Sequence, residues 1–106
     1  MAKYLIQGSY SGEGVSGLLK EGGSGRRAAI KSLLKSIGGR MEAFYYAFGE
    51  TDVYVIVDVP DNVTAAALSM IVNAAGAVSI KVTVLLTPEE IDEAAKKTVK
   101  YRPPGQ

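Results

Sequence analysis

Two segments of alternating residues, 52–59 and 77–86, constrain the fold of this chain more than any other feature. Every second position in them is aliphatic, and these positions are Val53, Val55, Val57 and Val59, then Val78, Ile80, Val82 and Val84. The positions between them are mixed and include Tyr54, Asp58 and Lys81. Because successive side chains of a strand point to opposite faces, the pattern predicts two strands of a sheet with one apolar and one half-polar face. We expect helices to cover the apolar face and the other face to meet a partner or a ligand.

The composition is that of one ordinary globular domain. The chain has 106 residues, of which 47% are hydrophobic and 22% are charged. A net charge of +1 gives no basic or acidic field, so we expect neither nucleic acid nor a membrane as a partner. The longest apolar stretch, 65–78, is shorter than the roughly 20 residues that span a bilayer. Because the N-terminus lacks the apolar run of a signal peptide and the chain has no cysteine, we expect a cytoplasmic protein.

The other segments supply the elements that complete such a sheet. Alternation and turn residues predict further strands at 3–10 and 40–48, and they extend the last strand over 78–87. Apolar residues at helical spacing predict helices at 15–20, 24–37 and 63–75, and a last helix that begins at Pro88. The order is β-α-β-β-α-β with a C-terminal helix, which is the ferredoxin-like pattern. It predicts an α+β fold with a four-stranded antiparallel sheet, two helices on one face, and an open second face that pairs with another sheet.

The ends of the helices carry their own signals. We expect Ser24 to cap the second helix, and Thr87 and Glu90 to form a capping box at the start of the last one. The helix dipole favours acidic residues in the first turn and basic residues at the end, so we expect Lys96, Lys97 and Lys100 near the end of the last helix. The proline-rich segment 101–106 forms an extended or disordered tail behind a domain at 1–100.

The predicted helix at 63–75 is apolar on nearly all sides. A helix without a polar face is buried on more than one side. We therefore expect either an assembly larger than a dimer or a tail that covers this helix.

Four segments resemble the GYD-domain family, small proteins of unassigned activity: YLIQGSYSGEGVSGLLKEGG, GRRAAIKSLLKSIGGR, EAFYYAFGETDVYVIVDVPDN and VLLTPEEIDEAAKK. The resemblance covers nearly the whole chain, and FGETDVYVIVDVPD is its most specific part. The motif that names the family has a tyrosine between glycine and aspartate, whereas Glu50 and Thr51 separate Gly49 and Asp52 here. The family is similar to the dimeric α+β barrels, in which two ferredoxin-like subunits pack sheet against sheet around a cleft. The resemblance therefore implies such a homodimer, and it transfers no catalytic residue.

Two glycine-rich motifs favour turns over cofactor sites. The segment 12–17 matches the dinucleotide fingerprint GxGxxG, but an antiparallel hairpin follows where that fold needs a parallel strand. The segment 22–27, with Arg26 and Arg27, suggests an anion site at a helix start but lacks the lysine of a phosphate-binding loop. We expect no cofactor and no metal.

The residue types restrict the chemistry. Without histidine or cysteine the chain has no imidazole base, no usual catalytic triad and few ways to bind zinc. Acid–base work would fall to carboxylate, lysine or tyrosine groups, and the candidates on the open face are Asp58, Lys81 and Tyr54. Asp58 and Lys81 would form a proton-transfer pair in an enclosed cleft, or a structural ion pair or edge charges at the sheet margin.

Three functions fit these observations. The first is a homodimer or higher homo-oligomer that encloses a small, mostly apolar ligand between open sheet faces. Its expected ligand-binding residues are Gln7, Ser9, Tyr45, Tyr54, Asp58, Lys81 and Thr83. The second is a cofactor-free isomerase or monooxygenase-like enzyme that uses Asp58 or Lys81 as its base. The third is a purely structural assembly module whose sheet contact is dry and complete.

Overall fold

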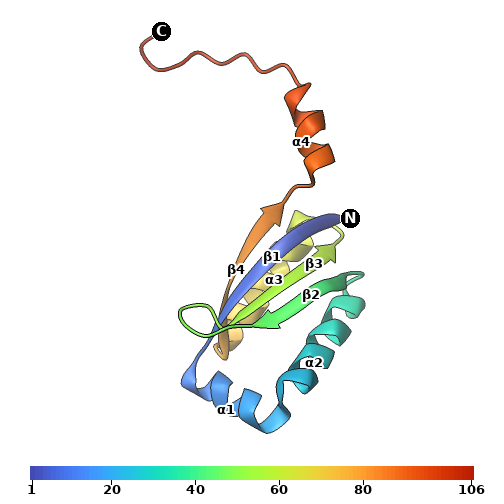
Figure 1. Cartoon of the computed structure of the whole chain (residues 1–106), viewed down its shortest axis with the longest axis vertical. Helices are drawn as coiled ribbons and strands as arrows, with labels where there is room; N and C mark the ends of the chain where they lie inside the picture. Colours follow the sequence, from blue (N-terminus) through green and yellow to red (C-terminus); the bar gives the residue numbers. More distant parts are fainter.

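Alternating residues form the four strands of one sheet in the computed structural model, which describes residues 1–106 (Figure 1). The strands are β1 (Ala2–Tyr10), β2 (Arg40–Tyr46), β3 (Val53–Val59) and β4 (Val78–Leu85). They lie in the order β2-β3-β1-β4, and every neighbouring pair is antiparallel. This is the strand order of the ferredoxin-like β-α-β-β-α-β arrangement, so the predicted α+β fold with a four-stranded antiparallel sheet is confirmed.

The register assigns each strand residue to one of two faces. Tyr4 and Ile6 of β1 lie opposite Val57 and Val55 of β3, and all four side chains are buried. This face carries the core. The residues between them form the open face, which includes the predicted positions Gln7, Ser9, Tyr45, Tyr54, Asp58, Lys81 and Thr83.

A bulge in β2 changes the alternation of that strand. The pairing with β3 shifts between Met41 and Ala43, so that Glu42 is an extra residue. Regular alternation over the predicted strand 40–48 places Glu42 on the face opposite Ala43, but its side chain bonds Lys3 of the open face. That detail of the prediction is therefore wrong, because the bulge puts two successive residues on the same side.

Two helices precede β2, namely α1 (Gly12–Glu21) and α2 (Gly23–Ser36). The predicted break between them is confirmed, and it consists of Gly22 alone, with a φ of 81° that favours glycine. Ser24 lies inside α2 and is not its cap, so that prediction is wrong. Helix α2 has no side-chain cap at all.

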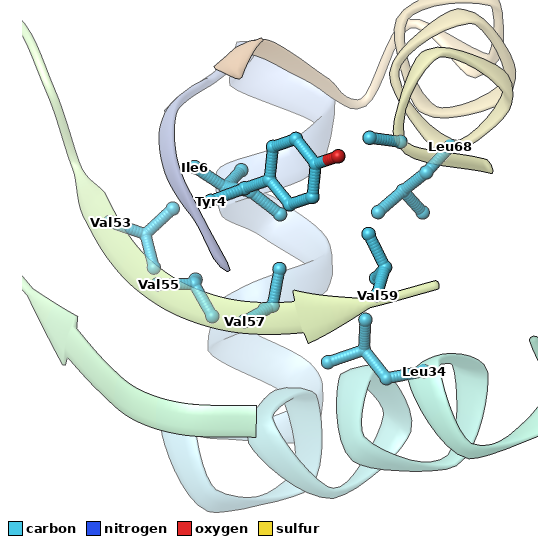
Figure 2. Packing of buried hydrophobic residues seen from close by; sticks show 9 residues of the cluster. Tyr4, Ile6, Leu34, Val53, Val55, Val57, Val59 and Leu68 are labelled. Atoms are coloured by element: carbon cyan, nitrogen blue, oxygen red, sulfur yellow. The ribbon is translucent and has the colours of Figure 1, made fainter. Parts of the chain in front are cut away.

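The core lies between the sheet and the helices α2 and α3 (Asn62–Ala75). Figure 2 shows Leu34 reaching Val59 from α2, and Tyr4 pointing from β1 toward α3. The Tyr4 hydroxyl donates a hydrogen bond to the side-chain oxygen of Asn62, the first residue of α3. The buried tyrosine therefore has its polar end satisfied, and it fixes the start of α3 against β1.

The outer side of α3 has no cover. Ala65 and Leu68 are buried, but Val63, Met70 and Ile71 are 80%, 72% and 71% exposed. The tail does not cover this helix, because residues 88–106 are all exposed. The expectation that the tail covers α3 is therefore excluded within a single chain.

The last helix, α4 (Pro88–Ala95), points away from the sheet (Figure 1). The capping box of Thr87 and Glu90 is confirmed. The helix ends at Ala95, and Lys96 is its C-terminal cap residue. The prediction of lysines near the helix end is therefore confirmed for Lys96, whereas Lys97 and Lys100 lie beyond the cap. We call residues 86–106 the C-terminal arm.

Candidate functional site

The open face differs between its two ends. At one end Lys3 of β1 lies opposite Asp58 of β3. At the other end Gln7 of β1 lies between Tyr54 of β3 and Lys81 of β4. The two positions on β1 are four residues apart, which is ~13 Å at the rise of a strand. We call these regions the charged end and the pocket end.

At the charged end all the ionic groups have partners within the chain. Asp58 is 6% exposed, and its two carboxylate oxygens receive Lys3 Nζ at 3.4 Å and Arg40 Nε at 3.3 Å. Lys3 also forms an ion pair with Glu42. The Glu42 carboxylate, and after it Asp58, hold the pKa of Lys3 above its ordinary value of 10.5 against the opposing effect of burial. This end is a closed network in which a buried carboxylate is compensated by two cations.

At the pocket end the side chains line a hollow of about 240 Å³. The lining residues are mostly polar: Gln7, Ser9, Glu50, Thr51, Ser79, Ile80 and Lys81. Lys81 is exposed and forms no ion pair within the chain. Its ammonium group is therefore free to bind a ligand.

The loop between β2 and β3 forms one wall of this pocket, and β1 holds it in place. The Asp52 amide donates to the Gly8 carbonyl at 2.8 Å, and the Asp52 carboxylate accepts from the Tyr10 amide at 2.8 Å. The Ser9 hydroxyl donates to the Glu50 carbonyl. These bonds bring Glu50 and Thr51 to the edge of the sheet next to Ser9. The aspartate of the segment FGETD thus has a structural role, since it attaches the loop to β1.

Aromatic and aliphatic side chains adjoin the pocket on the open face. Tyr54 lies opposite Gln7 and Tyr45, and Ile56 lies opposite Leu5. Tyr45 and Tyr54 are 70% and 38% exposed. The strip is therefore an apolar surface with hydroxyl groups, and a partner or ligand could cover it.

The structure separates the predicted site residues into two groups. Gln7, Ser9 and Lys81 line one pocket, and Tyr54 adjoins it. Asp58 lies at the charged end and does not pair with Lys81; its partners are Lys3 and Arg40. Thr83 lies opposite Leu5, between the two ends. The proton-transfer pair is therefore not formed within one chain.

Glu50, Thr51 and Ser79 also line the pocket, although the sequence did not predict them as site residues. Ser79 could have been found, because it alternates with Lys81 on the same strand face. From the sequence, Glu50 and Thr51 were predicted only as part of a turn. Their place beside Ser9 depends on bonds between residues far apart in the chain.

A second hollow lies on the other face of the sheet, among α2, α3 and the strands. It has a volume of about 60 Å³, and twelve of its thirteen lining residues are hydrophobic. The exception is Arg26, which pairs with Glu21 at 3.4 Å. Its lining includes core residues such as Leu34, Val55 and Leu68, so this hollow is a packing gap between the helices and the sheet.

The glycine-rich motifs have structural roles. Residues 12–17 form the start of α1, where the Gly14 backbone lies so close to the Ala77 carbonyl that a Cβ would be 2.0 Å from its oxygen. The Gly23 carbonyl accepts a hydrogen bond from Tyr46 Oη at 3.2 Å. Burial, together with the neighbouring Tyr10, raises the pKa of Tyr46. Both motifs thus fix helices to the sheet.

Fold and site together define a ferredoxin-like α+β domain with a hollowed open face. A family model described as GYD domain matches residues 4–95, and the chain therefore belongs to the GYD-domain family. No curated protein and no solved structure matches the chain. None of its helices has the length and apolar content needed to cross a membrane.

Proposed function

We propose that the chain is a homo-oligomeric binding domain, in which the open faces of two copies enclose a small molecule with an apolar body and one polar end. The observation that carries the proposal is the pocket of about 240 Å³ next to an uncovered aromatic strip. Ligand pockets commonly combine apolar walls with a few polar groups that fix orientation.

The pocket end supplies hydrogen-bond donors for the polar end of the ligand. Lys81 offers an ammonium group and Gln7 an amide, both on the same row of the sheet. Donors of this kind bind a carbonyl or a single carboxylate. Tyr54, Tyr45 and Ile56 would contact the apolar body, so the ligand remains mostly apolar.

The size of the pocket supports the participation of a second copy. Ligand pockets enclose roughly 300–1,000 Å³, and the hollow of about 240 Å³ lies on the surface of one sheet. A second open face, placed against the first, would add the missing wall and cover the exposed tyrosines. It is also the arrangement of the barrels that the family resembles.

The two alternatives have less support. An enzyme that uses Asp58 as its base would need substrate to reach that carboxylate, but Asp58 is 6% exposed and bonds Lys3 and Arg40. Of its two candidate bases, the enzyme alternative therefore retains Lys81. A dry structural contact would leave the polar pocket unfilled, which costs free energy because its groups lose water without gaining partners.

The test is a titration with 8-anilinonaphthalene-1-sulfonate, a fluorescent probe with an apolar body and one anionic end. We expect Lys81→Met to weaken probe binding about five- to tenfold, or ~1 kcal/mol, because a charged hydrogen bond is lost. Lys35→Met is the matched control, since Lys35 is exposed on α2 and lies outside the pocket. Equal probe affinity of the Lys81→Met protein and the wild type would overturn the proposal.

A further inference from the structure

We infer that the C-terminal arm, residues 86–106, docks on the exposed side of α3 in a second copy of this chain. The inference does not rest on the proposed ligand, because it concerns a different surface. The first observation is that helix α4 packs against no other part of its own chain.

Helix α4 cannot derive its stability from its own chain. It has eight residues, and every residue from 88 to 106 is exposed. Isolated helices shorter than ~12–15 residues are marginal in water. The capping box of Thr87 and Glu90 favours the helix start but does not replace packing. A helix this short is stable when its apolar side is buried against another surface.

The arm carries the apolar side chains for such a contact. Leu86, Ile91, Val99 and Tyr101 are 57%, 52%, 79% and 73% exposed. Ala94 and Ala95 follow Ile91 by three and four residues and so share its side of the helix. The arm thus exposes an apolar surface over most of its length.

The acceptor that fits this surface is the uncovered side of α3. Val63 and Met70 are about two turns apart, and Ile71 follows Met70 directly, so the three lie on one broad side of the helix. They are the most exposed large side chains of α3. From Asn62 to Ile80 the chain contains no charged residue. The arm helix and α3 thus each expose an apolar side. Packing of one helix against the other buries both sides at once.

The connection at Thr87 directs the arm away from its own α3. Thr87 is extended, with φ −74° and ψ 159°, and Pro88 follows at the first helical position. Figure 1 shows α4 and the C-terminus beyond the end of the sheet. The radius of gyration is 17.0 Å, compared with about 13 Å for a compact chain of this length. A second copy can receive the arm without any change at this connection.

A reciprocal exchange of arms is the arrangement that a twofold axis produces. Each copy then donates one arm and covers one α3. The arm, residues 86–106, has 21 residues, which is within the ~20–30 that each side of a standard interface contributes. The contact is therefore large enough for a stable assembly.

The test uses a photoreactive benzoylphenylalanine at position 91 in an equal mixture of ¹⁴N and ¹⁵N protein. We expect crosslinked dimers that join light and heavy chains, with the captured peptide within residues 62–75. The matched control carries the same group at position 19, where Leu19 is 81% exposed on α1, and should give no specific crosslink. Crosslinks within single chains, crosslinks to another region, or none at all would overturn the inference.

A second measurement does not depend on the crosslinker. Light scattering after size exclusion should show a smaller assembly for Ile91→Asp and for Met70→Asp, each with an unchanged circular dichroism spectrum in the sheet region. Leu19→Asp should keep the wild-type mass. The Ile91→Asp and Met70→Asp variants should both bind the fluorescent probe with an affinity that Lys81→Met still lowers, which separates failure of this inference from failure of the proposed ligand site. A wild-type mass for both Ile91→Asp and Met70→Asp would contradict docking of the arm on α3.

Discussion

The charged end and the pocket end of the open face contain similar residue types but differ in whether these residues are satisfied. At the charged end Asp58 is buried, and Lys3 and Arg40 are bonded to it. At the pocket end Lys81 has no ionic partner and borders a hollow. A titratable residue in a strand is thus a poor indicator of function by itself. The more informative observation is whether the residue already has hydrogen-bond or ionic partners within the chain.

The largest expected effect is the loss of Asp58. Asp58→Ala removes the acceptor shared by Lys3 and Arg40, and we expect the free energy of unfolding in urea to fall by about 1–3 kcal/mol. Both cations retain access to water, which limits the loss. Affinity for the fluorescent probe should stay at the wild-type value. A loss of probe binding at unchanged stability would show that the charged end is part of the site.

A smaller effect is expected from filling the pocket. Thr51→Tyr returns a tyrosine to the segment between Gly49 and Asp52, where the family motif has one. Because Thr51 lines the hollow, the larger ring should occupy it and weaken probe binding about fivefold, or ~1 kcal/mol. Ser32→Tyr is the control, since Ser32 is exposed on α2 and lies outside the pocket. Unchanged affinity would place the probe outside the pocket end.

The smallest effect is a change in stability at alkaline pH. The pKa of Lys3 is raised in the folded state. Its contribution to the free energy of unfolding is therefore complete below the unfolded pKa near 10.5, and it is lost as the pH rises through the folded pKa. Thermal unfolding should therefore show that Lys3→Met loses less stability than the wild type as the pH rises above about 10.5. Lys35→Met should follow the wild-type curve. Parallel curves for Lys3→Met and the wild type would mean that the charged network contributes nothing.

The sequence predicted the faces of the sheet well because alternation is a local signal. Gln7, Tyr54 and Lys81 could be placed on one face, and the structure brings them into one row. The partner of Asp58 could not be predicted, since it depends on the register between β1 and β3. The pattern offered Lys81 as the cation, whereas the register supplies Lys3.

Features that depend on tertiary contacts could not be predicted from the sequence either. Glu50 became a pocket residue through a bond from Ser9, which lies about forty positions earlier in the chain. Ser24 has the side chain of a cap, but the helix begins at Gly23. The last helix ends at Ala95, although the sequence up to Lys100 has the charge pattern of a helix end. In each case contacts between residues far apart in the chain, or the absence of such contacts, determined which of the locally possible structures formed.

The bulge in β2 determines which aromatic residues the open face presents. With Glu42 as the extra residue, Tyr45 lies opposite Tyr54 on the open face, while Phe44 and Tyr46 lie beside the core valines 55 and 53. If β2 alternated regularly through Glu42, Arg40 and Tyr45 would be five positions apart and would lie on opposite faces. The bulge thus lets an ion pair and a tyrosine occupy the same side of one strand. A chain without the extra residue would keep this register and lose only the carboxylate that pairs with Lys3.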